Sequence, residues 1–301
     1  MGILASDARM LLDARKNGVD FTDTMTIGDL TFYVTQRELK RLQSSYDIPF
    51  DNSSSILHFG SSSKPFFSHF LGVKNLKSID FSDYQGAFVL HDMNYPVPEY
   101  LEEAFDAVID GGSLEHIFNF PAAITNCMKM VKVGGSLFIF SIANNYCGHG
   151  FYQFSPELFF RLFQPEFGFS LKDLALVKVA FPGAELSRRQ IWYHVTDPAR
   201  LGRRSTLVTR KPLLIAVHAI RTAREPILDH YPQQSDYVRI WKDASDLPSR
   251  EVDSSFSLGV KVKNAARIVH KHLPLAVRNL VLGYRELWSC SLRDREFYKK
   301  W

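Results

Sequence analysis

Cysteine is scarce in this chain of 301 residues. The three cysteines, Cys127, Cys147 and Cys290, are widely spaced and odd in number. Such spacing fits neither a disulfide framework nor a paired-cysteine metal site. The sequence therefore predicts a protein of a reducing compartment, the cytoplasm by default.

Long apolar runs are missing as well. A bilayer crossing needs roughly 18 to 20 apolar residues, and the best run, residues 212–220, is short and interrupted by His218. The first eighteen residues carry charges inside their apolar stretch and do not have the form of a signal peptide. With apolar residues at 46%, 17 glycines and 14 prolines, the composition excludes disorder as the main state. We expect a globular protein without a transmembrane segment.

A strong excess of one charge is absent except near the C-terminus. The net charge is +4, yet residues 261–301 alone hold ten Lys or Arg against three acids. Within 260–287 the apolar and cationic residues interleave as on a helix with two faces. Three roles are open for such a helix. It packs on the rest of the chain, which is the role we favour, or it docks a partner, or it lies on an anionic membrane surface. Nucleic acid is the least favoured partner, because the tail has no recognised RNA-binding motif. No oligomeric state is predicted.

The rhythm of the chain predicts an α/β fold. From residue 55 to about 142, short apolar runs alternate with segments long enough for helices, which is typical of βαβ units. Two later runs are candidate last strands, separated by an arginine-rich loop, 187–210, that is long enough to be functional or mobile. The expected strands are 55–59, 76–80, 87–92, 105–111, 135–143, 169–180 and 212–220. We predict a Rossmann-like, doubly wound, mostly parallel seven-stranded sheet with N-terminal and C-terminal helical additions.

The segments outside this rhythm define three expected regions. Residues 1–50 are predicted to form an N-terminal extension, with a helix at 3–16, a hairpin around Gly28 and Asp29, and a second helix from Gln36. Residues 51–225 are predicted to form the ligand-binding domain, with helices at 120–131 and after the Ser155 cap. Residues 226–301 are predicted to form a basic helical extension.

Ligands of open parallel sheets bind outside the carboxyl ends of the strands. A carboxylate at the end of the second strand can accept two hydrogen bonds from a ribose diol, which makes Asp80 a candidate for that role. The first turn, at 60–64, lacks the glycine-rich patterns that let the backbone approach a pyrophosphate. Dinucleotides and nucleoside triphosphates are therefore disfavoured. S-adenosylmethionine carries ribose and adenine without phosphates and relaxes this demand.

One block carries a family resemblance. Residues 105–139, FDAVIDGGSLEHIFNFPAAITNCMKMVKVGGSLFI, resemble the fourth-strand region of class I S-adenosylmethionine-dependent methyltransferases, in particular the ubiquinone-type small-molecule group. Residues 148–163, GHGFYQFSPELFFRLF, also look like that group's segment before its last strand pair. The resemblance covers about residues 53–180 and implies a methyltransferase that uses S-adenosylmethionine as cofactor.

The resemblance also implies a set of cofactor-binding residues. It puts the first turn beside the methionine moiety, Asp80 on the ribose, Asp92 and Met93 beside the adenine, and Asp110 near the sulfonium. The first turn departs from the family pattern, because Ser62 and Lys64 stand where the family usually has glycine. The full expected set is Gly60, Ser61, Ser62, Lys64, Asp80, Asp92, Met93, Asp110 and Gly111.

Two histidines are candidates for catalysis. His116 can deprotonate an acceptor hydroxyl because imidazole titrates near neutral pH, and His149 lies in a glycine-flanked loop that suits a substrate lid. A structural role is the alternative for each of them. No metal site is expected, since His91/Asp92, Glu115/His116 and His270/His272 are isolated pairs without a recognised ligand spacing.

Two functions remain open at this stage. The leading one is a transferase that methylates a small molecule or a sugar, with oxygen as the favoured acceptor atom. The alternative is a degenerate methyltransferase-fold protein without catalysis, acting as a binding or scaffold module.

Overall fold

The computed structural model describes residues 2–48, 57–83, 86–179, 190–245 and 290–301. The chain divides into two compact units. The first comprises residues 1–195, 210–232 and 299–301, and the second comprises 196–209 and 233–298. Among the described residues, no helix has both the length and the apolar character needed to cross a membrane.

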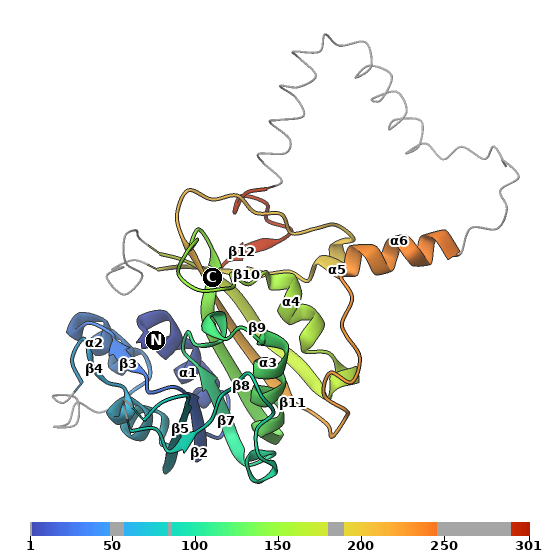
Figure 1. Cartoon of the computed structure of the whole chain (residues 1–301). Coiled ribbons are helices and arrows are strands. Elements are labelled where there is room, and N and C mark those ends of the chain that lie inside the picture. The colour runs from blue at the N-terminus through green and yellow to red at the C-terminus, as the bar shows by residue number, and fades with distance from the viewer. Residues whose placement is uncertain (1, 49–56, 84–85, 180–189, 246–289) are drawn as a thin grey trace, which may run out of the picture. The chain divides into compact units, whose positions relative to one another are not determined.

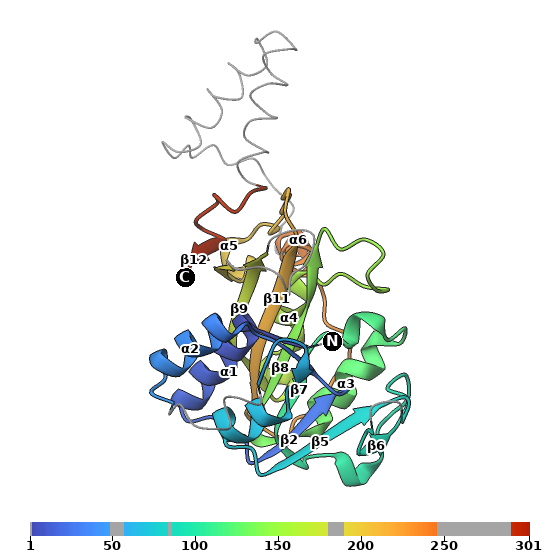
Figure 2. The same ribbon diagram turned by 90° about the vertical axis from the view of Figure 1, so that its left-hand side faces the viewer.

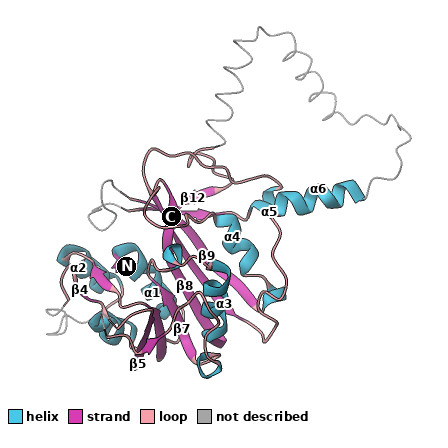
Figure 3. Cartoon of the chain, in the orientation of Figure 1, coloured by secondary structure: helices cyan, strands magenta, loops and turns pink. Residues whose placement is uncertain are grey.

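A large sheet forms the centre of the first unit (Figure 1; strands magenta in Figure 3). From one edge to the other the strands follow the order β12-β10-β9-β11-β8-β7-β2-β5-β6. Their bounds are β2 Asp23–Ile27, β5 Asn75–Asp80, β6 Val89–Leu90, β7 Phe105–Asp110, β8 Val131–Asn144, β9 Phe169–Lys178, β10 Ile191–Val195, β11 Leu213–Arg221 and β12 Tyr298–Lys300.

The directions of the strands give the sheet its Rossmann-like character. The neighbours β6, β5, β2, β7 and β8 all pair in parallel, whereas β11 runs antiparallel to both β8 and β9. Counted along the chain from β2 and without β10 and β12, the seven strands stand in the order 3-2-1-4-5-7-6. The order reverses between β2 and β7, which is the switch point where such sheets bind ligands. The predicted fold class is confirmed.

The first strand of the sheet lies elsewhere than predicted. We expected it at 55–59, but within that span only 57–59 are described, and they form no strand. The first strand is β2, whose polar Thr24 and Thr26 are fully buried. Their hydroxyls donate to the backbone oxygens of Phe21 and Gly28, at 2.7 and 2.8 Å. Because those bonds satisfy the hydroxyls internally, a strand with alternating threonines is stable at the centre of a sheet.

The expected hairpin around Gly28 is also wrong. The strand after it, β3, leaves the large sheet and joins a small three-stranded sheet of order β1-β3-β4. Residues 1–50 therefore belong to the same compact unit as the large sheet and supply one of its central strands. The bounds of the small sheet are β1 Gly2–Leu4, β3 Thr31–Tyr33 and β4 Ser61–Ser62.

Helices cover both faces of the large sheet (Figure 2). On one face α1, α2 and the π-helix η2 pack on a buried apolar cluster that includes Leu11, Leu39, Phe66 and Phe138. On the other face lie α3, capped by Asn119, and α4. The helix bounds are α1 Ala5–Lys16, α2 Gln36–Ser45, η2 Phe66–Leu71, η3 Glu99–Leu101, η4 Leu114–His116, α3 Phe120–Met130, α4 Pro156–Leu162 and η5 Pro165–Phe167.

The last third of the chain departs from prediction at two described points. Residues 226–301, predicted to be helical, include the strand β12, which joins the large sheet. The arginine-rich segment expected as a loop, 187–210, contains β10 and the short helix α5, Pro198–Leu201. The second unit holds α5 and α6, Ser235–Ser245, and within it Arg203 pairs with Asp294 and Glu296 at 2.8 and 2.7 Å. The amphipathic helix predicted at 260–287 lies outside the described residues.

Candidate functional site

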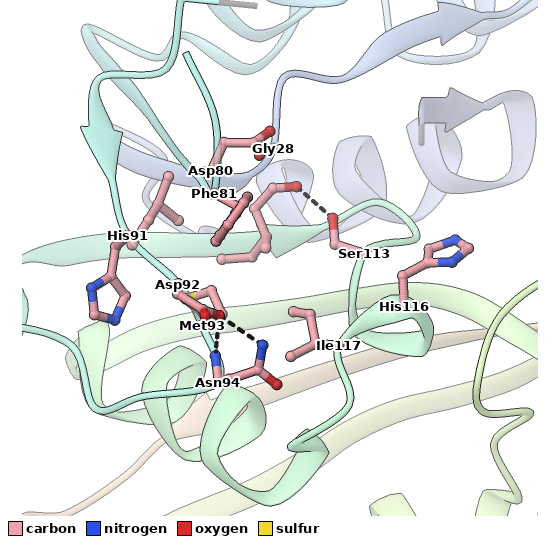
Figure 4. Close-up of a pocket in the computed structure, with 12 residues that line it drawn as sticks. Gly28, Asp80, Phe81, His91, Asp92, Met93, Asn94, Ser113, His116 and Ile117 are labelled. Atoms are coloured by element: carbon pink, nitrogen blue, oxygen red, sulfur yellow. Dashed lines mark hydrogen bonds between the residues drawn. The ribbon is translucent and has the colours of Figure 1, made fainter. Parts of the chain in front are cut away.

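A cavity of about 610 Å³ opens at the carboxyl ends of the parallel strands (Figure 4). We call it the strand-end pocket. Its lining comes from the ends of β2 and β5, the segment after β6, and the turn and short helix η4 after β7, so it stands at the switch point of the sheet. The lining residues are Ile27, Gly28, Ile79, Asp80, Phe81, His91, Asp92, Met93, Asn94, Ser113, His116 and Ile117.

Backbone geometry fixes the end of β2 at the pocket. Gly28 has a φ of 76°, a conformation that favours glycine, and turns the chain out of the sheet. Its N–H donates to the carbonyl oxygen of Ile79 in the neighbouring strand at 2.8 Å. On the other side, the hydroxyl of Ser113 donates to the carbonyl oxygen of Ile27 at 2.8 Å. The pocket wall at β2 is therefore held from both neighbouring strands.

Two carboxylates line the pocket. Asp80, half-buried at the end of β5, accepts a long hydrogen bond of 3.4 Å from the backbone N–H of Ser82. Asp92 accepts from the backbone N–H and the side-chain amide of Asn94, at 2.9 and 2.7 Å. These two donors lower the pKa of Asp92, so it stays ionised at neutral pH. Among the described residues that line the pocket there is no Lys or Arg.

Apolar surfaces complete the strand-end pocket. Met93 is 5% exposed, whereas Phe81 is 76% exposed, and Ile27, Ile79 and Ile117 add further apolar lining. A pocket of this size, with apolar walls and a few polar groups, is typical of small-molecule sites. It offers an aromatic base a surface to lie on.

A second, smaller pocket of about 270 Å³ lies on the other side of the turn after β7. We call it the inner pocket. It is lined by Gly2, Leu4, Asp7, Tyr33, Gly111, Gly112, Glu115, Phe140, Ser141, Ile142, Tyr146, His149, Val177, Leu214 and Ile215.

A buried carboxyl supports the turn that separates the two pockets. Asp110 is fully buried, and one of its oxygens accepts from the backbone N–H of Ser113 at 2.8 Å. Burial, and next the charge of Glu115, raise the pKa of Asp110 to about 8. The neutral form of this carboxyl is therefore favoured at pH 7, and Asp110 holds the turn without lining either pocket.

The two candidate catalytic histidines come together at this turn. His116 lines the strand-end pocket and His149 lines the inner pocket, and their ring centroids are 5.2 Å apart. The loop that carries His149 is anchored on Glu115, whose carbonyl oxygen accepts from the backbone N–H groups of Phe151 and Tyr152 at 2.8 and 3.2 Å. The sequence suggested that Glu115 and His116 are an isolated pair. The structure places His149 beside them, so that suggestion was wrong.

Other predicted site residues fall into three groups. Asp80, Asp92 and Met93 line the strand-end pocket as expected, and Gly111 lines the inner pocket instead. The first-turn residues line neither pocket. These are Gly60, Ser61, Ser62 and Lys64.

The first turn has a different structural context from the one predicted. Ser61 and Ser62 form β4 of the small sheet, and the ammonium of Lys64 lies 3.8 Å from a carboxylate oxygen of Asp29. The prediction placed the first strand of the large sheet at 55–59 and therefore placed these residues at its carboxyl end. In the structure that strand is β2, and its carboxyl end is formed by Ile27 and Gly28. Ile27 and Gly28 were missed for the same reason, whereas Ser113 follows β7, a strand that was predicted, and was left out of the expected set although its strand was found. The alternation of Thr24 and Thr26 with apolar residues before a glycine was the signal that could have found two of them.

Among known proteins, this chain is similar to solved structures. No model of a protein family matches the chain, and no curated protein matches it. A SAM-dependent methyltransferase from Thermotoga maritima is 15% identical, with 71% of this chain and 89% of that chain covered and a TM-score of 0.37. A SAM-dependent methyltransferase from Aquifex aeolicus is 9% identical, with 70% and 89% covered and a TM-score of 0.34.

A structure with a different activity is similar to the same degree. The branched-chain polyamine synthase from Thermus thermophilus is 12% identical, with 77% of this chain and 61% of that chain covered and a TM-score of 0.32. At such identities and TM-scores the likenesses do not decide a function. The function has to be argued from the strand-end pocket itself.

Proposed function

We propose that this chain is an S-adenosylmethionine-dependent methyltransferase that acts on a small molecule or a sugar, with oxygen as the acceptor atom. The observation that carries the proposal is the strand-end pocket. It lies at the switch point of a parallel sheet and carries two carboxylates and apolar surfaces, and its lining, as far as the structure describes it, has no Lys or Arg.

The chemistry of the pocket disfavours phosphorylated ligands. After β2 the chain enters a strand, β3, and not a helix, so no helix N-terminus stands there to bind a pyrophosphate. Asp80 and Asp92 would repel phosphate charges, and within the described lining no Lys or Arg offsets them. S-adenosylmethionine has the opposite character, because its sulfonium and ammonium groups are positive and it carries no phosphate.

The residues of the pocket fit the parts of this cofactor. Asp80 stands at the end of the second parallel strand, the position from which a carboxylate accepts hydrogen bonds from a ribose diol. Asp92 and Met93, on the segment after β6, offer a polar edge and an apolar surface to the adenine. We assign the methionine moiety to the wall formed by Gly28 and the turn at Ser113.

Methyl transfer asks little further of the protein. The bound cofactor supplies an already activated methyl group, and alignment with the acceptor, away from water, provides most of the acceleration. A hydroxyl acceptor needs a base, and His116 at the pocket and His149 beside it are the candidates. The inner pocket next to them has room for a small acceptor.

Calorimetric titration with S-adenosylmethionine and S-adenosylhomocysteine tests the proposal. Both should bind, and Asp80→Asn should weaken both about tenfold to a hundredfold, since a hydrogen bond to a charged group contributes roughly 1.5 to 3 kcal/mol. Lys64→Met is the control, because Lys64 does not line the pocket, and it should bind like the unaltered chain. No measurable binding of either compound to the folded protein would favour the alternative, a non-catalytic binding or scaffold module.

A further inference from the structure

Glu115 is a buried carboxylate without a cation. It is 2% exposed, and among the described residues no Lys or Arg forms an ion pair with it. One of its oxygens accepts a hydrogen bond from the hydroxyl of Ser141 at 2.8 Å. Buried carboxylates are stable in proteins when they are paired with a cation or coordinate a metal.

Two imidazoles lie beside this carboxylate. One ligand atom each from Glu115, His116 and His149 lies within 4.8 Å of the others. Both imidazoles are exposed, and within the described part of the chain neither makes a hydrogen bond that would occupy its ring nitrogens. Ligand atoms that share one ion at about 2.1 Å lie up to about 4.2 Å apart, so small rotations of the exposed rings close the set.

The backbone prepares this arrangement before any ion binds. Two N–H groups of the loop that carries His149 donate to the carbonyl oxygen of Glu115, which fixes the loop against the carboxylate. Gly150 lets the loop come this close, since a Cβ at that position would lie 2.7 Å from the same carbonyl oxygen. Ser141 holds the carboxylate from behind, as outer-sphere partners hold metal ligands.

We propose that Glu115, His116 and His149 form a site for one divalent transition-metal ion of the zinc class. Two imidazole nitrogens and one carboxylate suit Zn²⁺, Fe²⁺ or Co²⁺, whereas Mg²⁺ prefers oxygen ligands. Three protein ligands leave positions open for an oxygen of a bound molecule. His116 lines the strand-end pocket, and Glu115 and His149 line the inner pocket, so the site borders both. If the proposed methyltransferase function holds, on which this step rests, that oxygen belongs to the methyl acceptor. The bound ion would lower the pKa of the acceptor hydroxyl, so that neither imidazole has to act as the base, and the proton would pass to solvent water at the exposed imidazoles.

Titration of the chelator-treated full chain with ZnCl₂ tests the site. We expect one Zn²⁺ per chain and no comparable binding of MgCl₂. Glu115→Gln, His116→Asn and His149→Asn should each weaken Zn²⁺ binding at least tenfold, and Ser141→Ala about tenfold to a hundredfold. His69→Asn, an exposed histidine outside both pockets, is the matched control and should change nothing.

Several results would overturn the proposal. Zn²⁺ affinity that drops in both histidine variants but not in folded Glu115→Gln would reveal only a surface imidazole pair. If Glu115→Gln does not fold, the Zn²⁺ affinity of Ser141→Ala decides whether the carboxylate takes part. In a separate measurement, the visible absorption of bound Co²⁺ should lose its intensity in His149→Asn. Unchanged spectra and affinities would reject the site. S-adenosylmethionine binding, measured in the presence of chelator, is independent of all these results, so either proposal can fail alone.

Discussion

His218 lies in β11 between β8 and β9, where it is 5% exposed. Its ring stacks on Phe138 with centroids 4.3 Å apart, and its Nε2 lies 3.1 Å from the hydroxyl oxygen of Ser136. Burial lowers the pKa of His218 from 6.5 to about 4, because the interior of the sheet disfavours the charged ring. A single buried residue thus makes the sheet sensitive to acid.

The sign of this effect follows from proton binding. Between pH 6.5 and pH 4 the unfolded chain protonates His218 and the folded chain does not, so the free energy of unfolding falls as the pH falls through this window. The shift corresponds to a loss on the order of 3 kcal/mol. His218→Leu should remove this component and should therefore lose less stability than the unaltered chain between pH 7 and pH 4.

Urea unfolding at several pH values measures the difference. His69→Asn, which changes an exposed histidine, should follow the pH dependence of the unaltered chain. If the His218→Leu curve runs parallel to that of the unaltered chain down to pH 4, His218 titrates alike in both states and the argument from burial is wrong.

At the scale of elements, the loop between β8 and α4 is positioned by glycine. Gly150→Ala places a Cβ 2.7 Å from the carbonyl oxygen of Glu115 and 3.2 Å from its Cγ, so the loop must shift. The shift should lengthen the hydrogen bonds from Phe151 and Tyr152 and move His149 away from the carboxylate. We expect Zn²⁺ affinity to fall at least tenfold.

Gly148→Ala is the matched control in the same loop. Gly148 has a φ of 83°, so alanine there is strained by roughly 1 to 2 kcal/mol, but its Cβ meets no atom within 4 Å. Its Zn²⁺ affinity should stay close to that of the unaltered chain. Equal loss of affinity in the two variants would mean that general loosening of the loop, and not the contact with Glu115, is responsible.

The strands that sequence reasoning found, and the one it missed, differ in a physical way. Residues 105–111 and 135–143 are short, mostly apolar segments that are largely buried, and such segments predict parallel strands well, as β7 and β8 confirm. The strand β2 has only five residues, two of them threonines, and its place between β5 and β7 depends on partners far along the chain. The sequence pattern within β2 does not show which distant strands pair with it.

The candidate site shows the same division. Asp80, Asp92 and Met93 follow strands with clear patterns, and they line the strand-end pocket. The association of Glu115 with His149 joins residues 34 positions apart through a loop fold that spacing alone does not reveal. Residues tied to well-patterned strands were predictable, and those brought together by loops were not.

At the scale of the whole molecule, the N-terminal fifty residues are part of the folding unit. In the large sheet, β2 pairs along its length with β5 on one side and β7 on the other, from Asp23↔Asn75 to Ile27↔Asp110. The buried cluster under α1 and α2 also includes Leu11, Phe21 and Phe32 from this region. Removing the region leaves two parallel strands without their common neighbour and exposes a large apolar surface.

A chain of residues 51–301 should therefore fail to fold. Far-UV circular dichroism and gel filtration should show an aggregated or unfolded product. If residues 1–50 were only an extension outside the sheet, their removal would instead leave a folded chain. The matched experiment keeps every residue and cuts the chain at a protease site inserted within 49–56. The two fragments should stay together and keep cooperative unfolding, because the bonds of β2 to β5 and β7 hold them independently of the cut. A folded, monomeric 51–301 chain that binds S-adenosylmethionine would show that β2 is not needed at the centre of the sheet.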